Sequence, residues 1–141
     1  MPLDLTSLEN ALHQLEQVTQ RAHDEAFMSA QDDITRNAIR AGVIQHFEIV
    51  YELCWKFTQR WLRENRPGGD ADLPRTRKDL FRMAARDGLV SDPLIWFGFG
   101  DARNLTTHTY NEAEANTVFA QAMPLAREAR YTLEQLKAKN A

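Results

Sequence analysis

The sequence predicts an all-α protein, an up-and-down bundle of about five helices. Apolar residues recur at intervals of three, four and seven through most of the chain, which is the period of a helix with one buried face. No segment alternates with period two for long enough to form a strand. With 141 residues, 43% apolar and 26% charged, the chain has the size and composition of one domain with a real core. We therefore expect residues 1–141 to form a single helical domain.

The first helix is expected over about residues 6–28, since Thr6 and Glu9 form a capping box ahead of an apolar stripe. A polar break at residues 29–33 follows. The second helix is expected over about residues 33–65 and should be the centre of the core, because apolar residues cover more than half of its circumference. Its main stripe consists of Ile39, Val43, Phe47, Val50, Cys54, Phe57 and Trp61.

The second half of the chain contains three more predicted helices. Residues 65–70 break the second helix, and a short third helix over about 76–87 should stop at Gly88. Residues 91–93, Ser-Asp-Pro, start a fourth helix that runs into residues 103–110. Asn111 with Glu114 opens a fifth. Pro124 lies inside it and predicts a kink or a break, because proline costs about 3 kcal/mol in a helix interior.

Charge and cysteine content limit the function classes. The net charge of −3 argues against broad electrostatic capture of nucleic acid. Residues 75–86 nevertheless carry five cations and one acid, which suits a solvated helix face or, together with residues 103–110, a groove for phosphate. Cys54 is the single cysteine, and the N-terminus lacks the pattern of a signal peptide. No apolar run reaches the roughly 18 residues of a membrane span. We expect a cytoplasmic protein.

The segment from Arg103 to Tyr110 has the residues of a phosphodiester-cleaving site. Arg103 can bind the scissile phosphate, and His108 can remove the 2′-hydroxyl proton or protonate the leaving oxygen. Asn104 or Thr107 would fix the phosphate or the imidazole. The nucleophile would be the RNA's own 2′-oxygen, so the reaction needs neither metal nor cofactor, and DNA would not be cut.

The spacing leaves the geometry of this segment open. On an uninterrupted helix Arg103, Thr107 and Tyr110 share one face, and His108 lies well off it. Arg103 and His108 can converge only if the helix ends near residue 106 or if a second subunit supplies half of the site. Gly100 on the same face would let a backbone, a nucleotide or a second subunit approach closely. In the simpler alternative, Arg103 only caps the helix or pairs with a carboxylate, and His108 is a turn histidine.

Other polar and aromatic residues have less specific roles. Glu52 lies inside an apolar stripe, so it should pair with Lys56 or orient Arg103 or His108 across the bundle. No histidine pair or cysteine spacing indicates a metal site. His13, His23 and His46 are therefore expected to be core or surface histidines, and Trp55, Trp61 and Trp96 to be core or dimer-interface residues.

Three stretches together resemble one family, the HEPN family of small helical proteins, in its HepT-like branch, also called nucleotidyltransferase substrate-binding proteins. They are residues 41–56, Trp96, and residues 103–110. The most specific parts are the Arg-x4-His-x-Tyr pattern and the block Phe47-Glu-x3-Glu52-Leu-x-Trp-Lys56, about 50 residues apart. The resemblance extends from about residue 5 to residue 138.

The resemblance implies a homodimer whose Arg103 and His108, with Asn104 beside them, cleave RNA without metal at the dimer interface. It also implies a partner, a minimal nucleotidyltransferase that acts as antitoxin by attaching AMP to Tyr110. An adenylylated Tyr110 would place bulk and negative charge beside Arg103. Two alternatives remain. The chain is either a non-catalytic adaptor that presents a substrate to the nucleotidyltransferase, or a purely structural dimerisation module.

Overall fold

The computed structural model describes residues 2–66, 74–106 and 112–140, and the regular secondary structure in these ranges is entirely helical. The all-α prediction is therefore confirmed, with six helices in the described part of the chain where about five were expected. They are α1 (Thr6–Ala22), α2 (Glu25–Ser29), α3 (Asp33–Asn65), α4 (Arg77–Arg86), α5 (Pro93–Leu105) and α6 (Glu112–Lys139).

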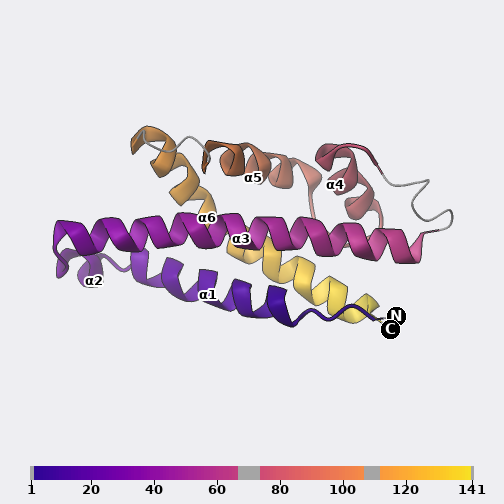
Figure 1. The fold of residues 1–141 in the computed structure, drawn as a ribbon, viewed down its shortest axis with the longest axis horizontal. Coiled ribbons are helices and arrows are strands. Elements are labelled where there is room, and N and C mark those ends of the chain that lie inside the picture. The colour runs from indigo at the N-terminus through magenta and orange to yellow at the C-terminus, as the bar shows by residue number, and fades with distance from the viewer. Residues whose placement is uncertain (1, 67–73, 107–111, 141) are drawn as a thin grey trace.

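Helix α3 is the axis of the molecule, as its apolar stripe predicts. It spans the length of the fold in Figure 1, with α1 along one side and α4 and α5 on the other, while α6 crosses the bundle. Its most extensive contacts are with α1 and α6. Val43, Phe47, Val50 and Cys54 are completely buried. The two ends of the chain meet, because the Asn140 side chain accepts a hydrogen bond from the Leu3 amide and donates one to the Leu3 carbonyl.

The first predicted helix is in fact two, so the expected range 6–28 is wrong. Helix α1 ends at Ala22, and α2 begins at Glu25. The Asp24 carboxylate accepts a hydrogen bond from the Phe27 amide at 3.0 Å, which makes Asp24 the N-cap of a new helix. Such a short acidic side chain competes with the helical backbone for its own neighbours' amides.

Capping residues fix the ends of α4 and α5, which carry much of the candidate site. Thr76 caps α4 at its start, and Gly88 adopts a left-handed φ of 78° just after its end. The Leu89 amide then bonds the Ala84 carbonyl at 2.8 Å, the pattern that closes many helices. Asp92 caps α5, with Pro93 in its first turn. The predicted start of α5 is confirmed.

A kink or a break was expected at Pro124, and the break does not occur, because helix α6 runs through Pro124 without interruption. Seven residues of α6 are fully buried and follow a helical stripe. They are Val118, Ala122, Leu125, Ala129, Thr132, Leu133 and Leu136. Packing of this stripe offsets the local cost of the proline. Within the described ranges, none of the helices is both long enough and apolar enough to span a membrane.

Candidate active site

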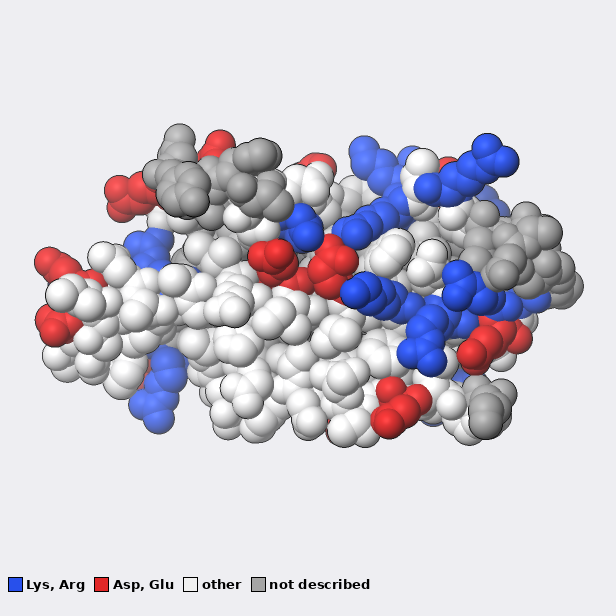
Figure 2. Space-filling view, in the orientation of Figure 1, with Lys and Arg blue, Asp and Glu red and all other residues white. Residues whose placement is uncertain are grey.

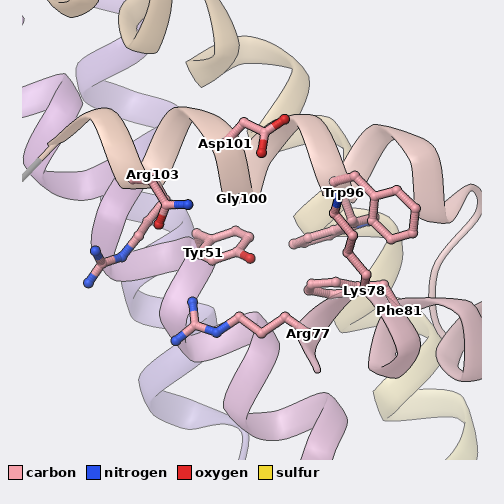
Figure 3. A pocket seen from close by; sticks show the side chains of 10 residues that line it. Tyr51, Arg77, Lys78, Phe81, Trp96, Gly100, Asp101 and Arg103 are labelled. Atoms are coloured by element: carbon pink, nitrogen blue, oxygen red, sulfur yellow. The ribbon is translucent and has the colours of Figure 1, made fainter. Parts of the chain in front are cut away.

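A pocket opens where α3, α4 and α5 meet, with a volume of about 280 Å³. Helix α5 supplies most of its wall, α4 supplies cations and an aromatic ring, and α3 supplies one tyrosine (Figure 3). The lining residues are Tyr51, Arg77, Lys78, Phe81, Trp96, Phe97, Gly100, Asp101, Arg103 and Asn104. Two of the three residues predicted to be catalytic, Arg103 and Asn104, thus lie on its edge.

Arg103 is held in place by α3. It lies in the last turn of α5, and its Nε donates a hydrogen bond to Glu52 Oε1 at 2.8 Å. Its terminal nitrogen lies 3.7 Å from Glu48 Oε1, at the outer limit of an ion pair. The Arg103 side chain is about one-quarter exposed. The guanidinium is therefore oriented by an acid and remains within reach of a ligand.

Glu52 holds a second arginine as well. The two terminal nitrogens of Arg77 donate to the two carboxylate oxygens of Glu52 at 3.0 and 3.2 Å. Partial burial alone would raise the pKa of Glu52, but the hydrogen bonds and charges of Arg77 and Arg103 lower it below its usual value. The Arg77 guanidinium also lies 4.4 Å from the centre of the Trp55 ring. One carboxylate thus ties α4 and α5 to α3.

The Tyr51 hydroxyl packs directly against Gly100 at the wall of the pocket. Tyr51 is buried, and a Cβ added to Gly100 would lie only 3.0 Å from the Tyr51 hydroxyl oxygen. Burial raises the pKa of Tyr51, so its hydroxyl keeps its proton at neutral pH. Behind Tyr51, Phe81 and Trp96 stack at 5.0 Å. The inner wall of the pocket is therefore aromatic and rigid.

The pocket is lined by three cations, Arg77, Lys78 and Arg103, and one acid, Asp101. On the face shown in Figure 2, Lys and Arg gather over α4 and the adjoining part of α3, beside the carboxylates that hold Arg103. Lys78 Nζ lies 5.5 Å from the Phe97 ring centre. No carboxylate in the described part of the chain forms an ion pair with Lys78. Lys78 can therefore meet an anionic ligand without first breaking a pair.

The structure answers part of the open question about residues 103–110. Helix α5 ends at Leu105 with Thr106 as its C-cap, so the helix that carries Arg103 ends near residue 106, which is one of the two conditions expected for Arg103 and His108 to converge. The predicted residues Thr107, His108 and Tyr110 lie outside the described residues. Of the partners considered for Glu52, Arg103 is the one with which it pairs, and Glu52 forms no ion pair with Lys56.

The sequence did not single out Tyr51 as a residue of this pocket, and it indicated Arg77 and Lys78 only as members of a basic run. That run, residues 75–86, has the same appearance as a solvated helix face, and Tyr51 lies in an apolar stripe that looks like core. Trp96 is fully buried, and Trp55 and Trp61 pack against the core from partly buried positions. In the described ranges no group of three or more histidine, cysteine or acidic side chains is arranged to hold a metal ion.

Comparison with known proteins gives one consistent assignment. The profile of the family "Nucleotidyltransferase substrate binding protein like" matches residues 3–138. A curated relative from Haemophilus influenzae, named "Probable ribonuclease HepT", is 36% identical over 138 residues, which cover 98% of this chain and 94% of the relative.

Solved structures agree with the sequence match. A Haemophilus influenzae structure, described as the fold of a substrate binding domain of a nucleotidyltransferase, has a TM-score of 0.89 and 36% identity, over 95% of this chain and 99% of that one. A crystal structure from Thermus thermophilus has a TM-score of 0.71 and 30% identity, over 92% and 98% of the two chains. This chain therefore belongs to the HepT-like family of nucleotidyltransferase substrate-binding proteins.

Proposed function

We propose that this chain is a metal-independent ribonuclease, the toxin of a pair with a minimal nucleotidyltransferase. The main support is the position of Arg103, whose guanidinium is oriented by Glu52 at the edge of a pocket that Arg77 and Lys78 also line. An enzyme that acts on a phosphodiester needs such a fixed cation where charge develops in the transition state. The name of the Haemophilus influenzae relative, a probable ribonuclease, supports the same function.

The proposed reaction uses only groups of the protein and the RNA. Arg103 binds the scissile phosphate, with Asn104 beside it and Thr107 in support. His108 removes the proton of the 2′-hydroxyl or protonates the departing 5′-oxygen. The 2′-oxygen forms a bond to phosphorus as the bond to the 5′-oxygen breaks, which leaves a 2′,3′-cyclic phosphate and a 5′-hydroxyl. Glu52 takes no part in proton transfer and positions Arg103.

A homodimer is part of the proposal. Leu94 and Ile95 expose apolar side chains at the start of α5, the helix that carries Arg103. An apolar surface there suits contact with a second copy of the chain. In the proposed dimer, Arg103 and His108 would contribute to one cleft between the two copies.

Control of the toxin is assigned to Tyr110. The nucleotidyltransferase would join the Tyr110 oxygen to the α-phosphate of ATP, with pyrophosphate as leaving group and loss of the phenolic proton. The added AMP would bring negative charge close to the phosphate-binding cation and compete with RNA. Mass spectrometry of the chain after incubation with ATP and its cognate nucleotidyltransferase should locate AMP on Tyr110, and Tyr110→Phe should stay unmodified and active.

The test of the nuclease is cleavage of tRNA and mRNA by purified protein in excess EDTA. Arg103→Ala and His108→Ala should each abolish cleavage. Arg130→Ala is the matched arginine control, because Arg130 is also partly exposed and paired with a glutamate, Glu16, on a different face. His13→Ala is the matched histidine control, since His13 is exposed and outside the pocket. Both controls should cleave like the unchanged protein.

The same assay separates the alternative function. The Haemophilus influenzae structure is described as a substrate binding domain, which favours a non-catalytic adaptor as the second candidate. Protein shown by mass to lack AMP, which nevertheless binds the nucleotidyltransferase and cuts no RNA, would reject the nuclease and support the adaptor. Cleavage that survives in both Arg103→Ala and His108→Ala would assign the activity to other residues.

A further inference from the structure

We propose that α4 is an RNA-binding helix, whose Lys78 and Arg82 bind phosphates of the substrate next to the one held by Arg103. The inference rests on the proposed ribonuclease function, because it extends the contact with the same RNA beyond the scissile bond. It deepens that function by naming the substrate, a strand of several linked nucleotides. Arg77 connects the two parts of the site, since it lies on α4 and shares the Glu52 carboxylate with Arg103.

Positive charge is concentrated around α4 although the chain has a net charge of −3. Residues 56–66 and 75–86 hold nine of the 17 lysines and arginines and only two of the 20 acidic residues. These ranges are the end of α3 and the whole of α4, and Figure 2 shows the cations gathered over them on one face of the molecule. An acidic protein with one such region draws a polyanion to that region and repels it elsewhere.

Arg103 and the cations of α4 border the same pocket. Arg77 and Lys78 line it together with Arg103, and in Figure 3 the Arg77 and Arg103 side chains end on the same side of the Tyr51 ring. Arg77 Nη1 and Arg103 Nε donate to one oxygen, Glu52 Oε1, at 3.0 and 2.8 Å. The cations of α4 therefore begin directly beside the proposed phosphate site.

Lys78 and Arg82 both lie against the ring of Phe97, which also lines the pocket. Lys78 Nζ is 5.5 Å from the ring centre, and the central carbon of the Arg82 guanidinium is 5.1 Å from it. An aromatic face positions a cation without neutralising its charge, and both side chains are exposed. Two cations held at one ring beside the pocket suit an anion that both can contact, such as a phosphate of the RNA backbone.

Neither of these cations is held by a strong competing ion pair. Lys78 has no ion-pair partner within residues 2–66, 74–106 and 112–140. Arg82 pairs with Asp79 at 2.6 Å, but both side chains are more than half exposed, at 52% and 55%. Surface pairs of this kind contribute little stability, so a phosphate can replace Asp79 as the partner of Arg82.

The surface around α4 suits RNA better than it suits a protein partner. Apolar and aromatic side chains form the centre of protein interfaces, whereas nucleic-acid interfaces are polar and positively charged. Of the large apolar side chains that stay exposed in the described part of the chain, none lies on α4 or in residues 56–66. The RNA backbone is therefore the favoured occupant, and docking of the nucleotidyltransferase on this face is the result that the test has to exclude.

The discriminating variant carries Lys78→Gln and Arg82→Gln together. Both side chains are exposed, so the double variant should fold as the unchanged protein does. Among the described residues neither one bonds Glu52, so Arg103 keeps its orientation. If the double variant does not fold, Lys78→Gln alone replaces it and should give half of the effect on the salt dependence of binding.

The matched control carries Arg127→Gln and Lys137→Gln, which remove the same charge from α6. Both positions are exposed and lie beside α1, since Arg127 shares a pocket with α1 residues and Lys137 forms a surface ion pair with Glu9 at 3.0 Å. Each double variant thus loses one paired and one unpaired cation of the described ranges. Circular dichroism and size-exclusion chromatography confirm fold and assembly before any comparison.

The first measurement is the binding of single-stranded RNA of about 12 nucleotides with a 2′-O-methyl group on every ribose, which blocks the 2′-oxygen and prevents cleavage. Fluorescence anisotropy gives its Kd over a range of salt concentrations. Each lost phosphate contact should lower the slope of log Kd against log salt by about 0.7, so the double variant should lose about 1.4. With equal binding at about 1 M salt, this change means about 25-fold weaker binding at about 0.1 M. The loss should not depend on base sequence.

The second measurement is cleavage of DNA oligonucleotides that contain one ribonucleotide, so that a 2′-oxygen can cut only one phosphodiester. Their length is varied from a dinucleotide to about 12 nucleotides. For the unchanged protein and the α6 control, kcat/KM should rise with length as phosphates reach α4. In the double variant this gain should be smaller by about tenfold or more.

The outcomes separate this proposal from the proposed function. A double variant with the same salt slope and the same gain with length as the α6 control would overturn the RNA-binding role of α4 and leave the nuclease standing. Loss of nucleotidyltransferase binding in that variant would then assign the face to the protein partner. A salt slope lowered only in the α4 variant, with no cleavage by the unchanged protein, would reject the nuclease and retain the RNA-binding helix.

Discussion

Replacement of Glu52 by glutamine tests how Arg103 is positioned. The substitution keeps the shape of the side chain and removes the negative charge of the carboxylate. That carboxylate accepts three hydrogen bonds, one from Arg103 and two from Arg77. Glu48→Gln is the matched control, one helical turn earlier on α3. Glu48 lies farther from Arg103, at 3.7 Å, and its side chain is 40% exposed, against 21% for Glu52.

The expected loss of stability follows from these distances. At the 2.8 Å separation of Arg103 Nε and Glu52 Oε1, the Coulomb attraction is about 6 kcal/mol for an effective dielectric constant of about 20, and about 1.5 kcal/mol in bulk water. Desolvation and side-chain ordering offset much of this attraction, so Glu52→Gln should reduce the free energy of unfolding by about 1–3 kcal/mol. Glu48→Gln should cost no more than about 0.5 kcal/mol.

The catalytic effect should appear in kcat and not in KM. Removal of an anion beside Arg103 leaves the attraction for RNA equal or stronger, so KM should be unchanged or lower. The guanidinium, however, loses the bond that orients it, and misplacement of a catalytic group by about 1 Å can cost on the order of 100-fold. We expect kcat to fall by about 10- to 100-fold in Glu52→Gln.

Urea denaturation and single-turnover cleavage of one oligonucleotide measure the two effects on the same preparations. Glu52→Asp, which keeps the charge on a shorter side chain, should restore more of the stability than of kcat. A Glu52→Gln protein that matches Glu48→Gln in both unfolding free energy and kcat would refute the positioning role. A rise in KM at constant kcat would show that Glu52 contributes to RNA binding by another route.

Three further results are expected. The pKa of Glu52 is lowered from its usual 4.5, so its contribution to stability is complete above that pH and is lost as the pH falls through the lowered value. In acid titrations, the difference in unfolding free energy between unchanged and Glu52→Gln protein should therefore shrink only below about pH 4.5. A difference that stays constant with pH would contradict the ion pair. Gly88→Ala should cost about 1 kcal/mol in urea denaturation because of its left-handed φ, and an unchanged midpoint would refute that strain. Burial raises the pKa of Cys54, so a thiol reagent should modify it only at the rate of unfolding, and rapid labelling of native protein would show that the α3 core opens locally.

Helix positions were predictable wherever local signals agreed. The limits of α3 coincide with the expected residues 33–65, because the Asp32 cap and a long apolar stripe point to the same helix. The break between α1 and α2 was not predicted. At this break the Asp24 carboxylate accepts the Phe27 N–H, which in a continuing helix would bond a backbone carbonyl. The periodicity of apolar residues does not show which of the two hydrogen bonds forms.

The sequence predicted which residue types form the candidate site, but not which side chains contact one another there. Arg103 stands out because a cation, an amide and a histidine follow a dense aromatic run. Its pairing with Glu52, 51 residues away, remained one alternative among several until the packing of α5 on α3 decided it. The contact of Arg77 with the same carboxylate was not predicted, because it depends on how α4 packs and no spacing along the chain encodes it.

The pocket itself depends on three helices at once. Gly100 indicated a place of close approach, but the residue that packs against it, Tyr51, lies on another helix inside an apolar stripe and had the appearance of a core residue. Both descriptions hold, since Tyr51 is buried and its hydroxyl faces the pocket. A residue of this kind can be assigned only after the helices are placed.

The most direct test of the central claim is the chemistry of the cleaved ends. The purified protein should be incubated in excess EDTA with a single-ribonucleotide oligonucleotide, and with the same oligonucleotide carrying 2′-deoxyribose at that position. Cleavage of the first alone, leaving a 2′,3′-cyclic phosphate and a 5′-hydroxyl and disappearing in Arg103→Ala, is the result that the account predicts. Cleavage of the all-deoxy oligonucleotide, or a 5′-phosphate on the product, would contradict it.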